Sequence, residues 1–404
     1  MPQGDHTPPA VVVGGLDNAV SLARALARRG VRVHAVGGID APVRFSRSCA
    51  AFHRVDLRDP QSEFLRWLLD DAPDGAVVLP CDDDAVEVVA RHRAEFVPRL
   101  IPMEGNDAAL LTMLDKDATY AHARAAGVPV PVTMVIENQA DVDAAIELLG
   151  FPCALKPRHT HEFARHFRRK VFVAEDAQAL RLAFADTSAH GLAMIVTEII
   201  PGPESSYCSM YTYLDERSEP LFLYTKRKLR QYPPGFGIGT YHMTHWDPAV
   251  AEMGLRLLQS AGFRGLANVE FKRDSRDGSL KLIECNARFT AANELLNRSG
   301  LDLAHFVYRR QLGEVVELPA RARDGVYMWS PITDTLAFVA AQRDGDLTLR
   351  DWIASLLHPQ HTPLFSWRDP GPSAFSLYYM SARTGRRLLQ RRTPDAPAAD
   401  AAVA

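Results

Sequence analysis

The sequence has little cysteine, and its cysteines form no paired motif. Five cysteines are scattered along 404 residues without a CxxC pair, and their number is odd. This pattern is typical of reduced thiols and argues against a disulfide framework or a zinc site made of cysteines. The start of the chain, MPQGDHTPPA, is polar and contains prolines, unlike a signal peptide. We therefore expect a protein of the cytoplasm.

The sequence also lacks long apolar runs and an excess of charge of one sign. No apolar run approaches the ~20 residues needed to span a bilayer, so no transmembrane segment is predicted. The formal net charge of -3 gives no reason to expect a nucleic acid as a partner. The length and an ordinary globular composition predict two or three domains.

The first forty residues have the pattern of a βαβ unit. A valine strand meets Gly14 and Gly15, a helical stretch follows, and VRVHAVG reads as a second strand. The turn lacks the GxGxxG fingerprint of dinucleotide-binding sites. The pattern therefore favours the first crossover of a doubly wound sheet over NAD binding.

Three aspartates, Asp82 to Asp84, follow another predicted strand, GAVVLP. Acidic residues at a helix N-terminus suit the helix dipole, so capping is one interpretation. The other interpretation is that they border a ligand crevice at the carboxyl end of a parallel strand. On the second interpretation Asp83 is a candidate substrate contact.

Polar residues alternate along a predicted strand near residue 280. The stretch SLKLIECNARF places Glu284, Asn286 and Arg288 at every second position, so they share one face. The strand LANVEFK and the turn RDSRDGS predict a hairpin that brings Glu270 beside Glu284 and Asn286. Two carboxylates and an amide oxygen are ligands that Mg²⁺ uses when it also bridges nucleotide phosphates. The alternative is an ordinary charged sheet face.

Lysines that can neutralise a triphosphate occur at three places. Lys156 ends the strand CALKP, and Lys116 lies within one continuous predicted helix, LLTMLDKDATYAHARAAG. In YTKRKLRQYPPGFGIGTY, Lys226, Lys228 and Arg230 are predicted to alternate onto one strand face before a glycine-rich loop that can close over a ligand. A solvated strand face fits the last pattern equally well.

The stretch TEIIPGPE offers a slot for an adenine base. Ile199 and Ile200 end a predicted strand, and the Pro-Gly-Pro turn leads the backbone away, which leaves main-chain groups free for the base. The carboxylate of Glu204 can accept hydrogen bonds from ribose hydroxyls.

In this order and spacing, the motifs between about residues 105 and 313 resemble the ATP-grasp superfamily. The resemblance implies a fold of the α/β and α+β classes, with an N-terminal doubly wound αβ domain before the ATP-grasp domain. We expect that N-terminal domain at 1–104 and the ATP-grasp domain at 105–315, with a small lid subdomain at about 129–200. A C-terminal extension at 316–404 would follow, with a frayed end.

The same resemblance assigns roles to individual residues. The metal-binding residues would be Glu270, Glu284 and Asn286. The catalytic residues would be Arg288, Lys156 and Lys228, with Arg288 near the transferred phosphoryl group. The residues in contact with ATP would be Lys116, Lys156, Glu198, Ile199, Ile200, Glu204 and Lys226. The candidate substrate contacts are Arg230, Asn293 and Asp83, although Asn293 and Glu294 can instead cap a helix that begins there and runs to about Gly313.

One stretch departs from the superfamily pattern. After LKP, many members carry a small glycine-rich phosphate loop, whereas this chain has RHTHEFARHFRRKVFV, with no glycine. We interpret it as a basic lid that contacts phosphates or an acidic substrate through Arg158, Arg168, Arg169 or Lys170. A zinc site is the alternative for His159, His161 and His166, but an HxH pair without further ligands is a weak signal.

Within the superfamily, RKLRQYPPGFGIGTY and the later LTLRDWIASLLHP and FSWRDP look most like the D-aspartate ligase-type carboxylate-amine ligases. This likeness implies an enzyme that uses ATP and Mg²⁺, with Mn²⁺ as an alternative metal. It would join a small carboxylate to an amine through an acyl phosphate, and a homodimer would be unsurprising. Two other functions stay open: activation of bicarbonate, as in carboxylases and carbamoyl-phosphate synthesis, and ATP binding by a non-catalytic regulator.

Overall fold

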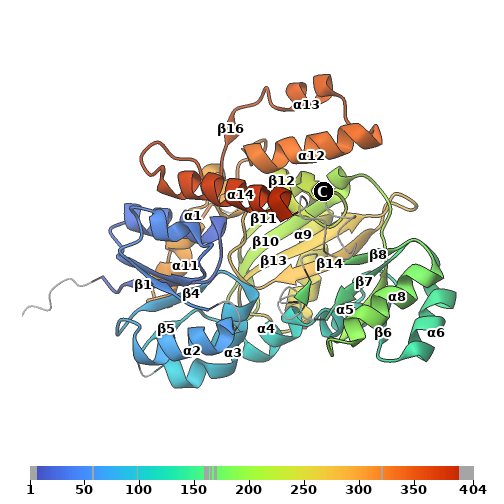
Figure 1. Ribbon diagram of the computed structural model, residues 1–404. Helices are drawn as coiled ribbons and strands as arrows, with labels where there is room; N and C mark the ends of the chain where they lie inside the picture. Colours follow the sequence, from blue (N-terminus) through green and yellow to red (C-terminus); the bar gives the residue numbers. More distant parts are fainter. Residues whose placement is uncertain are drawn as a thin grey trace, which may run out of the picture.

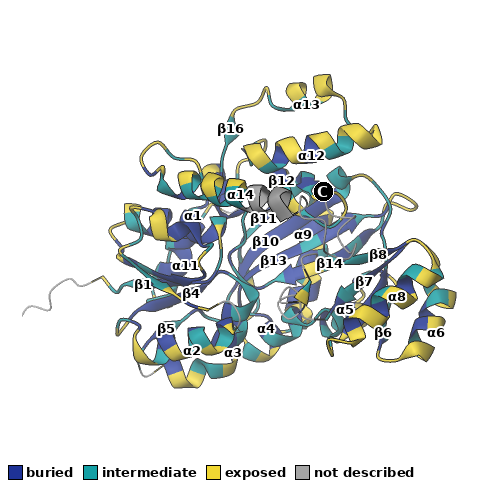
Figure 2. Ribbon diagram, in the orientation of Figure 1, coloured by how far each residue is buried: buried dark blue, intermediate teal, exposed yellow. Residues whose placement is uncertain are grey.

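The computed structural model describes residues 7–56, 59–97, 99–158, 163, 166–167, 171–319 and 322–390, with the backbone alone for 383–390. Its strands form three sheets of five, four and seven strands, with most helices on the outside (Figure 1). The strands are largely buried, whereas the outer faces of the helices are exposed (Figure 2). No helix in this described part is long and apolar enough to cross a membrane.

The first sheet has the order β3-β2-β1-β4-β5, and all its strand pairs are parallel. One face packs against α1 and the other against α2 and α3, as expected for a doubly wound sheet. Its strands are β1 (Ala10–Val13), β2 (Val33–Gly37), β3 (Ala51–Arg54), β4 (Val77–Pro80) and β5 (Ile101–Pro102). Its helices are α1 (Asp17–Arg28), η1 (Pro42–Phe45), α2 (Pro60–Asp70) and α3 (Asp83–Phe96).

The glycine pair after β1 is explained by close packing at this sheet, not by a dinucleotide. The strand order reverses between β1 and β4, so the loops that follow these two strands meet. The Gly15 N–H donates to Asp82 Oδ2 at 3.1 Å. A Cβ on Gly14 would lie 1.8 Å from that same oxygen, and Gly14 has φ +71°. Any larger residue would push the two loops apart.

The second sheet has the order β6-β9-β7-β8, and its helices α6 and α8 cover one face. Its elements lie within residues 129–200, and the role of this segment as a lid subdomain stays a prediction. Its elements are β6 (Thr133–Ile136), α6 (Gln139–Leu149), β7 (Cys153–Pro157), β8 (Phe172–Ala174), α8 (Ala177–Ser188) and β9 (Met194–Glu198).

The segment expected to be one helix before this unit forms two. Helix α4 (Asp107–Leu114) ends at Asp115, which leaves helical geometry with φ -89° and ψ 118°. The Asp115 side chain then accepts hydrogen bonds from the N–H groups of Asp117 and Ala118, so it caps α5 (Lys116–Ala125). The prediction of one continuous helix was wrong, and Lys116 lies at a helix N-terminus.

The third sheet has the order β14-β13-β10-β11-β12-β15-β16, and it is antiparallel over its first six strands, whereas β15 and β16 are parallel. Its strands are β10 (Tyr207–Leu214), β11 (Pro220–Tyr232), β12 (Ile238–Thr244), β13 (Gly265–Arg273), β14 (Leu280–Asn286), β15 (Tyr327–Trp329) and β16 (Gln360–His361). The helices are η2 (Glu204–Ser206), α9 (Pro248–Ser260), α10 (Asn293–Ser299), α11 (Leu303–Gln311), α12 (Pro331–Asp344), α13 (Leu349–Ser355) and α14 (Gly371–Gln390).

Strand β10 and helix α9 were not predicted from the sequence. The single helix expected up to Gly313 is instead the pair α10 and α11, separated by Gly300 at φ +106°.

The C-terminal segment is attached to both large sheets. Asp334 on α12 is fully buried and accepts hydrogen bonds from Arg230, Thr240, Trp329 and Trp352. Further along, Asp369 accepts hydrogen bonds from the side chains of Arg24 and Ser46 and from the Arg47 backbone, all in the N-terminal unit. The predicted division into 1–104, 105–315 and 316–404 stays a prediction.

Asp334→Asn tests the first of these attachments. The substitution leaves Arg230 buried without its counter-charge, which typically costs about 3–5 kcal/mol of unfolding free energy. We expect a loss of this size in urea unfolding followed by tryptophan fluorescence. Asp344→Asn, at the exposed end of the same helix, is the matched control and should change stability little. Equal stability of the two variants would contradict the interpretation.

Candidate active site

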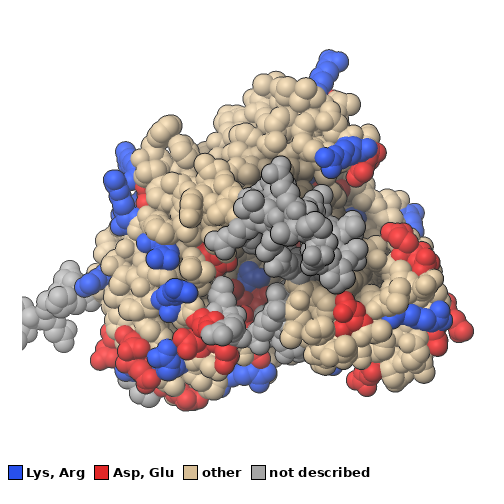
Figure 3. All heavy atoms as spheres, in the orientation of Figure 1, with Lys and Arg blue, Asp and Glu red and all other residues tan. Residues whose placement is uncertain are grey.

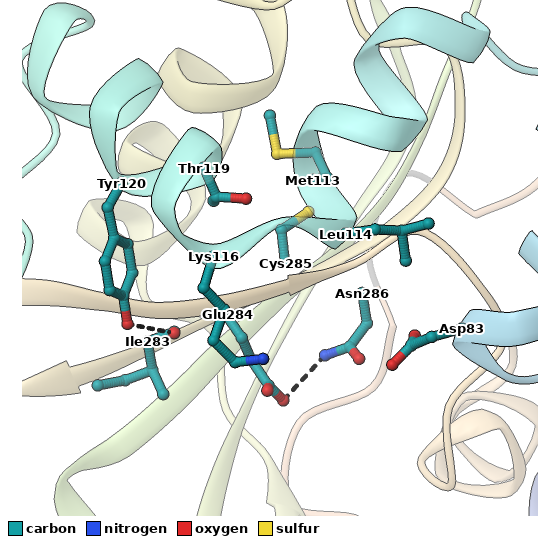
Figure 4. Close-up of a pocket in the computed structure, with 10 residues that line it drawn as sticks. All are labelled: Asp83, Met113, Leu114, Lys116, Thr119, Tyr120, Ile283, Glu284, Cys285 and Asn286. Atoms are coloured by element: carbon teal, nitrogen blue, oxygen red, sulfur yellow. Dashed lines mark hydrogen bonds between the residues drawn. The ribbon is translucent and has the colours of Figure 1, made fainter. Parts of the chain in front are cut away.

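The hairpin of β13 and β14 has the predicted register. Glu270 lies opposite Glu284 and Asn268 opposite Asn286. The Asn286 Nδ2 donates to Glu284 Oε1 at 3.0 Å, so the amide oxygen of Asn286 faces away from that bond (Figure 4). Glu284 and Asn286 line one pocket together with Lys116 and Asp83.

Glu270 is held by a buried lysine. The Lys228 Nζ lies 2.9 Å from Glu270 Oε1, and the two side chains are 7% and 12% exposed. The same Nζ also donates to Gln231 Oε1 at 3.1 Å. The Tyr207 ring centroid lies 4.1 Å from Lys228 Nζ and 5.0 Å from Lys272 Nζ. The ring therefore separates two cations while attracting both.

Two lysines near these carboxylates have lowered pKa values. Burial and, to a smaller extent, the charge of Lys116 lower the pKa of Lys156 to about 8, against the opposing effect of Glu284 and Glu270. Burial likewise lowers the pKa of Lys226 to about 8, although Glu270 opposes the shift. An anion placed beside either lysine would stabilise its protonated, charged form. In the space-filling view, acidic and basic atoms are visible together in the hollow at the middle of the molecule (Figure 3).

Arg288 meets the N-terminal unit. Its Nε lies 2.6 Å from Asp83 Oδ1, at the start of α3. The neighbouring Asp82 accepts from Ala85 N and caps this helix, and Asp84 accepts from Gln61 of α2. Capping is therefore confirmed for Asp82, whereas Asp83 faces the pocket.

In the segment expected to hold adenine, one backbone carbonyl and two carboxylates already have hydrogen-bond partners. Lys272 Nζ donates to the Ile200 carbonyl at 2.8 Å. The Glu198 carboxylate accepts a hydrogen bond from the Val132 N–H and pairs with Arg276, and its contact with ATP stays a prediction. Glu204 accepts from Gln231 N and Gly235 N, each at 2.9 Å, and so anchors the glycine-rich loop. A carboxylate has further lone pairs, and the ribose role of Glu204 stays a prediction.

Arg230 does not share the face of Lys226 and Lys228, which corrects the prediction. The ladder shifts register between Lys228 and Arg230, so Lys228 pairs with His242 and Arg230 with Tyr241. Adjacent residues of a strand point to opposite faces, and a β-bulge therefore redirects the side chain. The Arg230 guanidinium lies over the Tyr241 ring and pairs with Asp334.

Asn293 and Glu294 do not cap α10, because Ala292 is the N-cap residue and no side chain bonds there. Both are buried and face α1 instead: Asn293 Nδ2 donates to Ser21 Oγ at 3.0 Å, and Ser21 Oγ donates to Glu294 Oε2 at 2.9 Å. A substrate role for Asn293 stays a prediction.

Most of the expected basic lid lies outside the described residues, including His159, His161, Arg168, Arg169 and Lys170. Arg158 is described, and its Nη2 lies 3.0 Å from Asp115 Oδ2. Within the described part of the chain, no group of three His, Cys, Asp or Glu residues could hold a metal. The frayed end expected after residue 392 is also outside the described residues.

Sequence reasoning missed several residues that shape the site. Met113, Leu114, Thr119 and Tyr120 line the pocket, and the Tyr120 hydroxyl donates to the Ile283 carbonyl at 2.8 Å. These residues surround Lys116, but the break at Asp115 that turns them toward β14 has no strong sequence signal. The sequence does contain a signal for Lys272, because its spacing of two residues from Glu270 along β13 places both side chains on one face.

Comparisons with known proteins found curated relatives that are named as ligases. The chain is 26% identical over 287 residues to a D-aspartate ligase of Enterococcus faecium, covering 69% of this chain and 65% of the relative. It is 29% identical over 195 residues to a D-alanine–D-alanine ligase of Stutzerimonas stutzeri, covering 46% of this chain and 59% of the relative. The chain thus spans somewhat less than two thirds of the length of these curated relatives. No protein-family model matches it.

Solved structures share the arrangement of the sheets. The biotin carboxylase domain of the Hydrogenobacter thermophilus 2-oxoglutarate carboxylase superposes with a TM-score of 0.61 at 15% identity, covering 80% of this chain and 74% of that chain. An L-amino acid ligase of Bacillus licheniformis gives 0.59 at 14% identity, covering 80% and 79%. The chain has the ATP-grasp fold.

The ion pair of Lys228 and Glu270 can be tested without any ligand. We expect Lys228→Met to lower the unfolding free energy by about 3 kcal/mol, because it leaves a buried carboxylate with less counter-charge. Glu270→Gln should cost at least as much, since it leaves Lys226 and Lys228 facing each other. The double variant should be more stable than the sum of both losses predicts, as measured by urea unfolding. Simple additivity would show that the pair is not coupled.

Proposed function

We propose that the protein is an ATP-dependent carboxylate-amine ligase that forms an amide bond through an acyl phosphate. The observation that carries the proposal is Glu270 opposite Glu284, with Asn286 beside them, on a sheet face rich in buried lysines. A ligand with several negative charges and a bound divalent cation would suit this face, because the negative charges would pair with the lysines and the cation with the carboxylates. The names of the curated relatives, D-aspartate ligase and D-alanine–D-alanine ligase, support the same class of reaction.

The reaction solves the problem that a carboxylate is a poor acyl donor. A carboxylate oxygen attacks the γ-phosphorus of ATP, the bond from phosphorus to the β,γ-bridging oxygen breaks, and ADP leaves. The amine nitrogen then attacks the carbonyl carbon of the acyl phosphate, phosphate departs, and the nitrogen loses a proton. In such transfers a protein contributes mainly positioning and charge neutralisation. Here Lys116 and Lys156 would hold the phosphates, and Arg288 would stabilise the negative charge of the transition state.

The oxygen ligands present fit Mg²⁺, and Mn²⁺ fits the same type of site. Glu270, Glu284 and the amide oxygen of Asn286 would hold the ion, and phosphate oxygens and water would complete its coordination. When bound, it would neutralise charge on the phosphates. Because Asn286 Nδ2 already donates to Glu284, its oxygen is the atom left for the metal.

For the substrates, we propose an amino acid or a peptide-like molecule as one partner and a small amine as the other. The two curated relatives are named for D-amino acids. We further propose the cytoplasm as the location and a homodimer as the assembly. Bicarbonate activation is the alternative reaction, and a requirement for bicarbonate would distinguish it.

The first test is ADP release with Mg-ATP, hydroxylamine and a panel of L- and D-amino acids. Hydroxylamine converts an acyl phosphate into a hydroxamate, so the correct acid is detected before the amine is known. We expect a hydroxamate from one acid. ADP release that depends on bicarbonate, with no hydroxamate, would overturn the ligase proposal, and ATP binding without turnover would favour a regulator.

Glu284→Gln tests the metal site. We expect ADP release to fall at least 100-fold while the melting temperature changes little, because Glu284 is on the pocket surface and its charge is removed without loss of volume. Glu252→Gln is the matched control on α9, where the carboxylate pairs only with exposed Arg256 among the described residues. Activity of the Glu284 variant equal to that of the control would remove the metal assignment.

The pKa values near 8 of Lys156 and Lys226 predict proton uptake on ATP binding. Below pH 8 both ammonium groups are already protonated, whereas above it phosphate must raise their pKa and draw in protons. ATP affinity should therefore fall as the pH rises above about 8. Calorimetry in two buffers of different ionisation enthalpy should show uptake at pH 9 and little at pH 7. The double variant Lys156→Arg, Lys226→Arg should show no proton uptake on ATP binding. Uptake that persists in this variant would show that other groups take up the protons.

A further inference from the structure

Arg288 lies on a short segment that the N-terminal unit holds at two points. The first is the ion pair with Asp83, with 2.6 Å between Arg288 Nε and Asp83 Oδ1. The second is Asn18 on α1, whose Nδ2 donates to the Phe289 carbonyl at 2.9 Å and to the Cys81 carbonyl at 2.7 Å. Asn18 is 7% exposed. The Arg288 side chain and the Phe289 backbone are thus held by the first turns of α3 and α1, the helices that follow β4 and β1.

The atoms used in the ion pair determine what the guanidinium can still bind. A guanidinium carries its five N–H donors in one plane, and Asp83 takes the donor at Nε. This single-point contact leaves Nη1 and Nη2 for another oxygen ligand. A contact through both Nη atoms would have blocked that edge.

The ion pair lies in a largely enclosed place, with the Arg288 and Asp83 side chains 19% and 31% exposed. Arg288 follows the proposed metal ligand Asn286 by two residues. Asp83 and Glu284 line the same pocket (Figure 4).

We propose that Asp83 is a positioning residue that directs the Nη edge of Arg288 toward the reacting phosphoryl and acyl oxygens, with Asn18 fixing the backbone beside it. This inference rests on the proposed ligase function. It makes the N-terminal unit part of the catalytic apparatus. It also replaces the expectation that Asp83 itself binds the substrate.

The activity test compares Asp83→Asn with Asp84→Asn, the same chemical change one residue along, where the carboxylate accepts from Gln61 instead. In the hydroxylamine assay, we expect Asp83→Asn to lower kcat about 10- to 100-fold, the usual effect of removing a group that orients a functional side chain. The KM for ATP should stay within about twofold, because other residues hold the nucleotide. Asp84→Asn should behave as wild type.

A second comparison separates positioning from a general structural effect. In the Arg288→Lys background, Asp83→Asn should cause little further loss of kcat, because the group that it orients has been replaced. Equal losses in both backgrounds, or a kcat of Asp83→Asn equal to that of Asp84→Asn, would overturn the inference.

A third measurement needs neither ATP nor activity. In the ligand-free protein, Asp83→Asn and Arg288→Met should shift the urea midpoint non-additively, with the double variant more stable than the two single losses predict. Additive shifts would show that the contact is absent in solution and would overturn the inference. A wild type that forms no hydroxamate with any acid would instead reject the proposed function, and the urea midpoints would still decide whether Asp83 and Arg288 are coupled.

Discussion

The constraint on which the structure depends is the burial of several lysines on one face of the seven-stranded sheet. Lys226, Lys228 and Lys272 are less than one tenth exposed. Burial of a charge is unfavourable unless partners compensate it, and here Glu270, the Tyr207 ring and the Ile200 carbonyl do so only in part. Burial lowers the pKa values of Lys156 and Lys226 to about 8, so the remaining positive charge would suit a polyanion. Partly compensated buried charge lowers the stability of a fold, a cost that is common where function requires strained or polar sites.

Part of this arrangement could be read from the sequence. The alternation of Glu284 and Asn286 and the position of the turn after β13 were enough to place Glu270 opposite Glu284, because strand register follows from the two-residue side-chain period. The N-terminal βαβ unit and strands β7 and β9 of the four-stranded sheet were also predicted, whereas β6 and β8 of that sheet were not. The predicted elements are short-range patterns bounded by glycine and proline.

Other features depend on contacts that no local pattern contains. The break at Asp115 arises because one side chain caps a helix, in a stretch whose apolar spacing continues without interruption. The face of Arg230 depends on a β-bulge, whereas alternation assumes an unbroken ladder. Strands β15 and β16 are too short to recognise, and they form through long-range pairing, β15 with β12 and β16 with β15. The roles of the site residues toward a nucleotide stay predictions, since they concern a ligand and not the fold.

The two buried aspartates of the C-terminal segment have a consequence for how substrates enter. Asp334 anchors this segment to the seven-stranded sheet and Asp369 anchors it to the five-stranded sheet, so the segment bridges the two (Figure 1). A bridge of this kind opposes hinge motion between the units that it joins. The four-stranded sheet of β6 to β9 has no such attachment to the C-terminal segment among the described contacts. On the proposed function, opening and closing around a nucleotide would fall to this sheet, which would move against a frame made of the other two.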